Sequence, residues 1–284
     1  MKTAILIDTG ANVLDIKDDN VYFVPIQLII REQQIEKELK DVIDVSQEQL
    51  KQILINKTNI HTSLPSPGFV MKKLDELFLK YDRVVILTLS SGLSSYFESL
   101  SIIKEDYKDK HLVCIDSRSV SIGILWLVDE INLLLKNNPS DEELIGLVKQ
   151  RSQKIIGGVI VNNLDQLIAG GRVKKTKGII AKALRLKLIV RWNGQLDFMD
   201  KTPNLSTAID KLLDIINNQN HWRTNGIKNI AILTDLENES QINSLKTSLQ
   251  EKIRQTIEIK ISYLPGCIYA HVGLNNFAIL IEAK

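Results

Sequence analysis

The sequence has only two cysteines, Cys114 and Cys267, and they stand far apart with no C-x-x-C pair. This absence excludes a disulfide framework and a cysteine-ligated zinc site, and it fits a reducing compartment. The four histidines form no metal-binding motif. G-x-G-x-x-G after a strand and G-x-x-x-x-G-K-[ST] are also missing. We therefore expect no nucleotide, no metal ion and no other cofactor.

Long apolar runs and a large excess of charge are missing as well. Asp8 interrupts the first apolar stretch, and no run reaches the roughly 18 residues of a membrane span. The net charge of +2 gives no field that calls for nucleic acid. We expect a cytoplasmic protein with no integral membrane segment. The 284 residues, 44% of them hydrophobic, can bury the core of one large domain or two smaller ones.

The first half alternates strand and helix patterns. Apolar, β-branched runs predict strands over residues 3–7, 21–30, 84–89 and 111–115, and helical periodicity predicts helices over residues 46–55, 69–81, 93–100 and 120–135. Ser46 and Gln49 have the spacing of a capping box, and Ser140 is the expected N-cap of a further helix. This order predicts an α/β domain over residues 1–155, built on a parallel sheet covered on both faces.

The pattern changes after residue 155. We expect strands over residues 159–161, 187–192, 196–199, 227–233, 257–264 and 277–281, and helices over residues 205–216 and 240–253. Asn193 and Gly194 predict a two-residue hairpin turn. Hairpins mixed with helices predict a second, α+β domain over residues 156–284.

Two hydroxyl-rich loops, residues 62–68 and 90–95, precede or begin predicted helices. Their hydroxyl and backbone N–H groups suit a negatively charged head group, although Ser and Thr are also ordinary helix caps. Ligands of parallel α/β sheets bind at the carboxyl ends of the strands. Five polar residues fall at such ends: Asp8, Ser90, Ser91, Asp116 and Ser117. The sequence therefore predicts an anion site at this edge, or else a pair of helix caps.

Ser91 has a second interpretation, as a nucleophile. With His271 and either Asp8 or Asp116 it would complete a hydrolase triad. The G-x-S-x-G elbow of such enzymes is absent, because Leu89 stands where the first glycine is expected. His271, in a predicted loop between two late strands, is by itself more often structural.

Gly170, Gly171 and Arg172 form the other candidate anion site. Glycines let the backbone approach a ligand and arginine supplies a fork of donors, but a glycine after residues 163–169 is also an ordinary helix C-cap. Between residues 166 and 196 the charged residues are all basic: Arg172, Lys174, Lys175, Lys177, Lys182, Arg185, Lys187 and Arg191. Such a run is either a solvated face or a docking patch for an acidic protein.

In order and spacing, these motifs resemble those of the DegV family over nearly the whole chain. The resemblance is carried by these segments: residues 7–9, 24–26, 62–68 (close to T-S-Q-P-S-P), 90–94 (close to S-S-x-L-S-G-T), 116–117, 121–123, 163–167, 170–172 and 271–273. The family implies an EDD fold of two domains and a long-chain fatty acid bound between them. It also implies a binding protein, not an enzyme, with no catalytic residue and no metal ligand.

The family resemblance assigns roles to individual residues. It implies that Thr62, Ser63, Ser91 and the Gly92 amide hold the lipid carboxylate. Arg172 and His271 are second candidates near the head group. The expected ligand is a fatty acid such as palmitate, stearate or oleate, and the expected protein partner is a fatty-acid kinase that makes acyl phosphate. Departures from the family pattern lie at Asn12, Ser95–Tyr96 and residues 186–188, 201–203 and 274–276.

Overall fold

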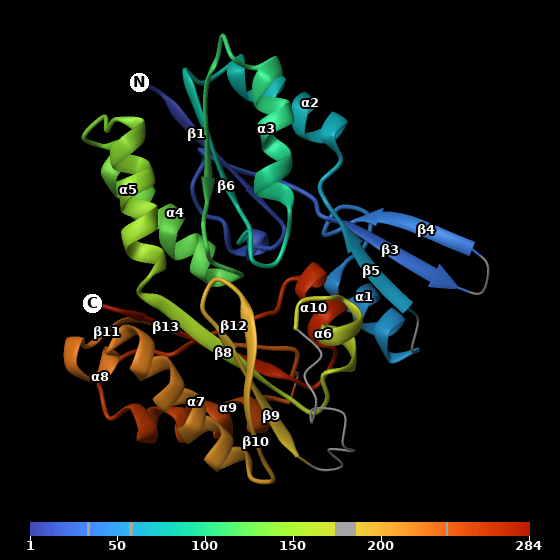
Figure 1. The fold of residues 1–284 in the computed structure, drawn as a ribbon, viewed down its shortest axis with the longest axis vertical. Coiled ribbons are helices and arrows are strands. Elements are labelled where there is room, and N and C mark those ends of the chain that lie inside the picture. Colours follow the sequence, from blue (N-terminus) through green and yellow to red (C-terminus); the bar gives the residue numbers. More distant parts are fainter. Residues whose placement is uncertain (33–34, 57–58, 174–185, 237) are drawn as a thin grey trace. The chain divides into compact units, whose positions relative to one another are not determined.

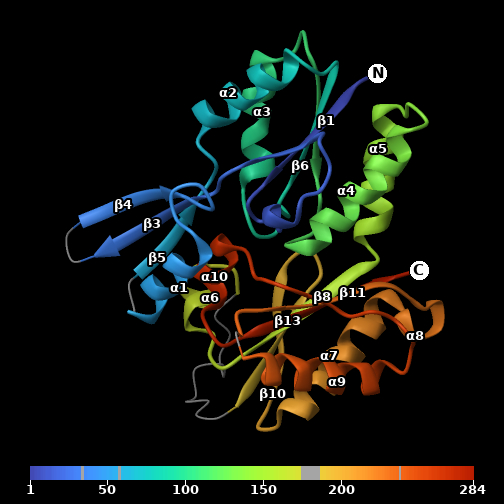
Figure 2. The same cartoon turned by 180° about the vertical axis from the view of Figure 1, so that it is seen from behind.

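The computed structural model describes residues 1–32, 35–56, 59–173, 186–236 and 238–284. The chain forms two compact units (Figures 1 and 2). The first consists of Met1–Ser152 and Pro265–Ala270, and the second of Gln153–Leu264 and His271–Lys284. Nothing in the sequence indicated that the short segment 265–270 belongs to the first unit. Both units mix helices and strands, and the α/β fold class predicted from the sequence is confirmed.

In the first unit strands and helices alternate over residues 35–135, and three consecutive strands lie over residues 21–40. Its strands are β1 (Thr3–Asp8), β2 (Val21–Val24), β3 (Gln27–Glu32), β4 (Ile35–Lys40), β5 (Asn59–Ser63), β6 (Arg83–Thr88) and β7 (His111–Asp116). Its helices are the 3₁₀ turn η1 (Val13–Asp15), α1 (Gln47–Ile55), α2 (Pro67–Phe78), α3 (Tyr96–Asp106), α4 (Ile122–Leu135) and α5 (Asp141–Ser152). The predicted capping box is confirmed, because the Gln49 amide donates to Ser46 Oγ and the Ser46 amide donates to Gln49 Oε1.

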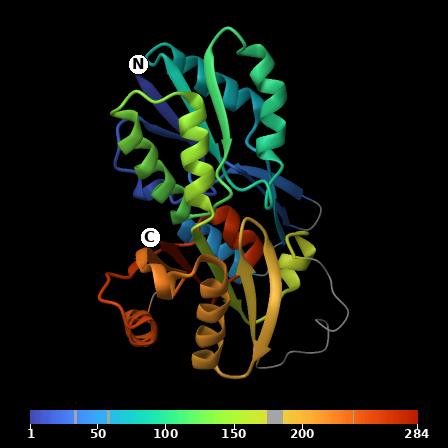
Figure 3. The ribbon, with the colours of Figure 1, turned by 60° about the vertical axis from the view of Figure 1, so that its left-hand side comes forward.

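Four parallel strands in the order β2-β1-β6-β7 form the main sheet of the first unit. One face packs on α2 and α3, where Leu6, Val84 and Ile86 lie in the same core as Leu74 and Leu100. The alternate side chains of these buried strands point to the opposite face. Helices α4 and α5 lie on that side of the sheet (Figure 3). A sheet buried on both faces explains the unbroken apolar runs of β1 and β6.

The prediction of one strand over residues 21–30 is wrong, because this segment contains two strands. β2 ends at Val24, and Pro25 and Ile26 separate it from β3. Proline has no N–H for a ladder, so the chain leaves the parallel sheet at this point. β3 instead pairs antiparallel with β4 and β5 in a separate three-stranded sheet, which the sequence did not predict.

The second unit is built on a six-stranded sheet in the order β10-β9-β8-β13-β11-β12. Its strands are β8 (Ile155–Val161), β9 (Lys187–Trp192), β10 (Leu196–Thr202), β11 (Ile227–Thr234), β12 (Lys260–Ser262) and β13 (Phe277–Ala283). Its helices are α6 (Asp165–Ala169), α7 (Leu205–Asn220), α8 (Trp222–Asn225) and α9 (Glu239–Ile253), and α10 (Gly266–Val272) runs from the first unit into the second.

The core of the second unit lies between the sheet and the helices α7 and α9. Ile189, Ile232 and Ile279 of the sheet pack with Leu212 and Leu249 of these helices. Figure 3 shows α7 alongside β9 and β10. The hairpin between β9 and β10 is confirmed, but its loop has three residues, since Trp192 pairs with Leu196. Gly194 takes the left-handed conformation, with φ of 74°, that such loops require.

Candidate functional site

The carboxyl edge of the parallel sheet gathers the polar residues that the strand ends predicted. Asp8 ends β1, and its carboxylate accepts hydrogen bonds from the backbone amides of Leu89 (2.6 Å) and Gly10 (2.8 Å). Complete burial raises the pKa of Asp8 from its ordinary 3.8 to about 6, although the two amides pull it down. The Asp8 carboxylate therefore fixes the backbone just after β6 by hydrogen bonding. The Asp8 side chain is fully buried and not accessible to solvent.

Ser91 and Asp116 lie together at the same edge. β6 and β7 are parallel with Thr88 opposite Asp116, so the residues after Thr88 pass beside the end of β7. The Ser91 hydroxyl donates to Asp116 Oδ2 at 2.6 Å, and the Ser91 amide donates to Asp116 Oδ1 at 3.1 Å. Ser91 is exposed and Asp116 half-buried. The hydroxyl and the amide of Ser91 thus both donate to the Asp116 carboxylate at the surface of the first unit.

Ser90 and Gly92, on either side of Ser91, have different surroundings. Ser90 is buried, and its amide donates to the carbonyl of Ser119 at 3.1 Å. The Gly92 amide, a predicted head-group donor, donates to Ser90 Oγ at 3.3 Å. Of Ser90 and Ser91, Ser91 is therefore the one whose side chain is exposed to a ligand.

Thr62 and Ser63 do not lie in a loop, as the sequence predicted, but in strand β5. They pair with Leu28 and Gln27 of β3, which places them in the three-stranded sheet. The residue before β3, Ile26, donates its amide to Thr9 Oγ1 just after β1, at 3.0 Å. Thr62 is half-buried and Ser63 exposed. After Ser63 the chain turns through Ser66, the N-cap residue, into α2, which packs on the parallel sheet.

His271 lies in helix α10, so the prediction of a loop around it is wrong. It packs against the Gly170 turn in the second unit, and a Cβ on Gly170 would lie only 2.3 Å from His271 Nδ1. Likewise, a Cβ on Gly273 would lie 2.0 Å from Gln166 Oε1. Two motifs about 100 residues apart in the sequence therefore meet, because glycine at both places leaves room for the opposite side chain.

Arg172 follows α6 and folds back on its own turn, where its guanidinium donates to the Gly170 carbonyl. It therefore shares the Gly170 turn with His271, and the structure brings these two second candidates into the same part of the second unit. Most of the predicted basic patch, Lys174 to Arg185, lies outside the described residues. At its far end Arg191 pairs with Asp197 at 2.7 Å, which neutralises one of its charges.

Sequence reasoning missed a buried cluster around Asp41. Asp41 Oδ2 accepts from the Cys267 amide at 3.0 Å, and Cys267 Sγ donates to the Thr9 carbonyl at 3.4 Å. Burial raises the pKa of Asp41 to about 6 and that of the Cys267 thiol well above its ordinary value. The cluster fastens the start of α10 to the first unit. No local pattern marks Asp41, which stands in a polar stretch 226 residues before its partner.

The segment 274–276, a departure from the family pattern, closes the end of α10. Asn276 Nδ2 donates to the carbonyl of Val272 at 2.8 Å, which satisfies a carbonyl at the end of that helix. Asn276 Oδ1 in turn accepts from the Asn162 amide at 3.2 Å, and the Asn275 amide donates to Asp235 at 2.7 Å. These asparagines thus have structural partners in the second unit.

The geometry gives the hydrolase interpretation of Ser91 little support. A hydrolytic serine passes its proton to an imidazole. Here the Ser91 hydroxyl donates to a carboxylate, and Asp8 is engaged with backbone amides. The positive-φ residues that follow the strands of this sheet are Arg118 and Ser121, and Ser91 is not among them. Ser91 therefore lacks the strained turn of a nucleophile elbow.

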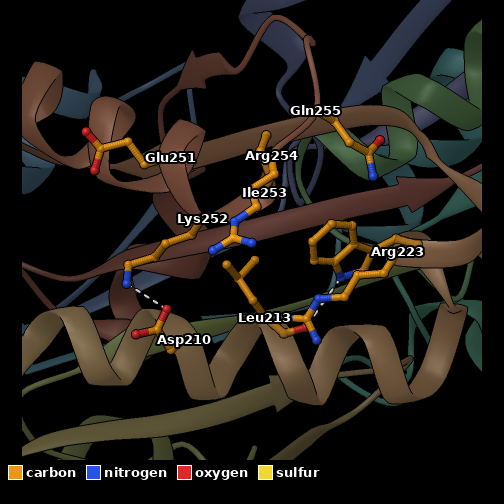
Figure 4. Close-up of a pocket in the computed structure, with 9 residues that line it drawn as sticks. Asp210, Leu213, Arg223, Glu251, Lys252, Ile253, Arg254 and Gln255 are labelled. Atoms are coloured by element: carbon orange, nitrogen blue, oxygen red, sulfur yellow. Dashed lines mark hydrogen bonds and ion pairs between the residues drawn. The ribbon is translucent and has the colours of Figure 1, made fainter.

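Two of the hollows among the described residues lie in the second unit. One, of about 630 Å³, is lined mostly by charged side chains. Figure 4 shows Lys252 donating to Asp210, at 2.6 Å, and Arg223 on the other side of the hollow. The other, of about 610 Å³, is lined by serines and asparagines and by apolar residues that include the buried Ile209, Leu245 and Phe277. Neither is lined by a residue that the sequence predicted for the head group.

Over the described residues, no group of three or more histidine, cysteine, aspartate or glutamate side chains is arranged to hold a metal ion. Within the same residues, the helices are too short or too polar to cross a membrane.

Comparison with known proteins gives a match along the whole chain. The family model described as "Uncharacterised protein, DegV family" matches residues 2–284. A DegV domain-containing protein of Ureaplasma parvum is 99% identical over 213 residues, which are 75% of this chain and 99% of the relative.

Solved structures match the fold at lower sequence identity. A fatty acid binding DegV family protein from Streptococcus agalactiae superposes with a TM-score of 0.84 at 22% identity, covering 100% of this chain and 99% of that one. A stearic acid-binding protein from Eubacterium ventriosum superposes with a TM-score of 0.81 at 17% identity, covering 99% and 98%. The full-length family match and the near-identical relative show that this chain belongs to the DegV family.

Proposed function

We propose that this protein binds a long-chain fatty acid, with the ligand between the predicted domains 1–155 and 156–284. The carboxylate is held by Thr62, Ser63, the Ser91 hydroxyl and the Gly92 amide of the first unit. Arg172 and His271, which share the Gly170 turn of the second unit, are the second candidates for the head group. Fatty-acid binding by the structural neighbours named above supports this assignment.

One observation carries the proposal most directly. Ser91 already binds a carboxylate, that of Asp116, through both its hydroxyl and its amide. Hydrogen bonds from neutral donors to an ionised oxygen are short and strong, and the 2.6 Å bond from Ser91 Oγ is of this kind. A turn that offers these two donors at an exposed position is suited to the head group of a fatty acid.

Most of the affinity comes from the acyl chain in this proposal. Burial of a methylene group contributes about 0.8 kcal/mol, so a chain of palmitate, stearate or oleate length supplies far more than the head-group bonds. The hydroxyls and amides then determine which end of the ligand enters and how it is oriented.

A protein of this kind binds its ligand without transforming it, and we propose that a separate fatty-acid kinase makes the acyl phosphate. The exposed position of Ser91 is consistent with presentation of a head group. The purified protein should accordingly show no Ser91-dependent turnover of a chromogenic ester. Turnover that disappears in Ser91→Ala would favour the hydrolase interpretation instead.

The first test is native mass spectrometry of the purified protein, followed by extraction and identification of the bound lipid. We expect one fatty acid per chain. Ser91→Ala should retain palmitate about 10-fold to 100-fold more weakly, because it loses one hydrogen bond to a charged group.

Ser101→Ala is the matched control. Ser101 is an exposed serine of the same unit whose hydroxyl donates to the Glu98 carbonyl within α3. This variant should keep its full lipid load. A wild-type protein that neither contains fatty acid nor takes it up would contradict the proposed function, and an unchanged load in Ser91→Ala would contradict the assigned head-group site.

A further inference from the structure

Two of the residues assigned to the ligand carboxylate, Ser91 and Gly92, already donate hydrogen bonds within the protein. Asp116 accepts three hydrogen bonds: from Ser91 Oγ at 2.6 Å, from the Ser91 amide at 3.1 Å and from the Arg118 amide at 2.9 Å. The Gly92 amide is directed to Ser90 Oγ. Ser91 therefore presents its hydroxyl proton and its amide to an internal carboxylate.

The backbone around Asp116 is shaped to keep that carboxylate in place. β7 ends at Asp116 beside the end of β6, and Arg118 takes a left-handed conformation with φ of 47°. This conformation is unfavourable for a residue with a side chain, and here it turns the Arg118 amide back onto Asp116. The carboxylate is thus held from both sides, by Ser91 and by its own turn.

We propose that Asp116 competes with a fatty-acid carboxylate for the donors of Ser91 and thereby sets the selectivity of the site between charged and uncharged head groups. This inference rests on the proposed function. A serine hydroxyl has one proton, so a fatty-acid carboxylate that takes it must displace Asp116. The two carboxylates then lie close together, and like charges at such a distance repel each other.

An uncharged head group meets a different situation. A fatty alcohol can donate its own proton to Asp116, and it adds no second negative charge beside it. Asp116 therefore weakens the binding of a fatty acid but not of the alcohol with the same chain. A carrier with such a competitor releases its charged cargo more readily than the acyl chain alone would allow.

The test is the variant Asp116→Asn, which removes the charge but keeps the size and an oxygen that accepts from Ser91. Delipidated protein is titrated with palmitate and with 1-hexadecanol, both delivered from cyclodextrin, in an isothermal calorimeter. We expect palmitate to bind about 10-fold tighter to the variant, since a repulsion of about 1.4 kcal/mol is a factor of ten. Binding of hexadecanol should change by less than about twofold on the same scale.

Two further variants keep the test decisive. If Asp116→Asn folds poorly, Asp116→Ser takes its place, because its neutral hydroxyl also accepts a hydrogen bond from Ser91. This variant should likewise bind palmitate more tightly than the wild type. Asp106→Asn removes an equal charge from the exposed end of α3 and should change neither ligand's affinity.

The outcomes separate this inference from the proposed function. Wild-type protein that binds neither ligand would overturn the proposed function itself. Wild-type protein that binds palmitate, together with variants at Asp116 that bind palmitate no tighter or lose affinity for both ligands alike, would overturn only the inference. In that case Asp116 would serve to hold the turn.

Discussion

The two units hold their candidate residues in different ways. In the first unit, carboxylates organise the site: Asp8 binds two backbone amides and Asp116 binds Ser91. In the second unit, close packing at glycines organises it, as at Gly170 against His271. Protonation or a competing anion changes the hydrogen bonds of a carboxylate. Close packing at a glycine is disturbed only when a larger side chain is introduced. The first unit is therefore the part expected to sense a charged ligand.

Gly158 provides the strongest test of steric packing in the second unit. It lies in the middle of β8 between β9 and β13, and an added Cβ would lie 2.5 Å from both the Val190 carbonyl oxygen and Leu212 Cδ1. Because a backbone atom cannot move aside without separating the strands, Gly158→Ala should lower the free energy of unfolding by about 3 kcal/mol or more. Urea denaturation measures this, and the loss should be equal at pH 5 and pH 7.

Gly146→Ala is the control for that measurement. Gly146 lies exposed in α5, and apart from its chain neighbours and the backbone of its own helix no described atom lies within 4 Å of the place where a Cβ would stand. The substitution should stabilise the protein by about 0.5–1 kcal/mol, the difference in helix propensity. A similar loss at both glycines would contradict the steric explanation.

The contact between Gly170 and His271 predicts a smaller effect. Here the added Cβ meets a side chain, which can turn away, so Gly170→Ala should cost about 2 kcal/mol. A double-mutant cycle checks the cause. In a His271→Ala background the same change should cost less than about 0.5 kcal/mol, because the ring that it displaces is gone. Equal costs in both backgrounds would show that the turn, and not His271, opposes the methyl group.

The buried carboxylates of the first unit should make the stability of the protein depend on pH. Burial raises the folded-state pKa of Asp41 to about 6, above its ordinary 3.8. The folded protein thus binds more protons than the unfolded chain between these values, so the contribution of Asp41 to stability falls as pH rises from about 4 to about 6. At its steepest this loss is about 1.4 kcal/mol per pH unit.

Asp41→Asn should remove that loss. The difference in unfolding free energy, variant minus wild type, is expected to rise between pH 4 and pH 6 and then level off. Asp8 titrates in the same range in both proteins, so its effect cancels in the difference. Urea denaturation at half-unit pH steps checks the prediction. If the difference in unfolding free energy between variant and wild type does not change with pH, ionisation of Asp41 does not cause the loss of stability.

Local sequence patterns determined a large part of this protein. The apolar runs of β1, β6 and β7, the capping box of Ser46 and Gln49, and the hydroxyl residues after β6 depend on neighbours within a few residues. Such patterns also predicted that polar residues would meet at the carboxyl edge of a parallel sheet, because parallel pairing aligns strand ends.

Only the tertiary structure decided which of these residues touch. Ser91 and Asp116 are 25 residues apart, and Asp41 and Cys267 are 226 apart. Pro25 ends β2, but the antiparallel pairing of β3 with β4 and β5 depends on segments that show no distinctive alternation. Hydrogen bonds and close packing across such separations arise when the whole chain buries its core, and no local periodicity records them.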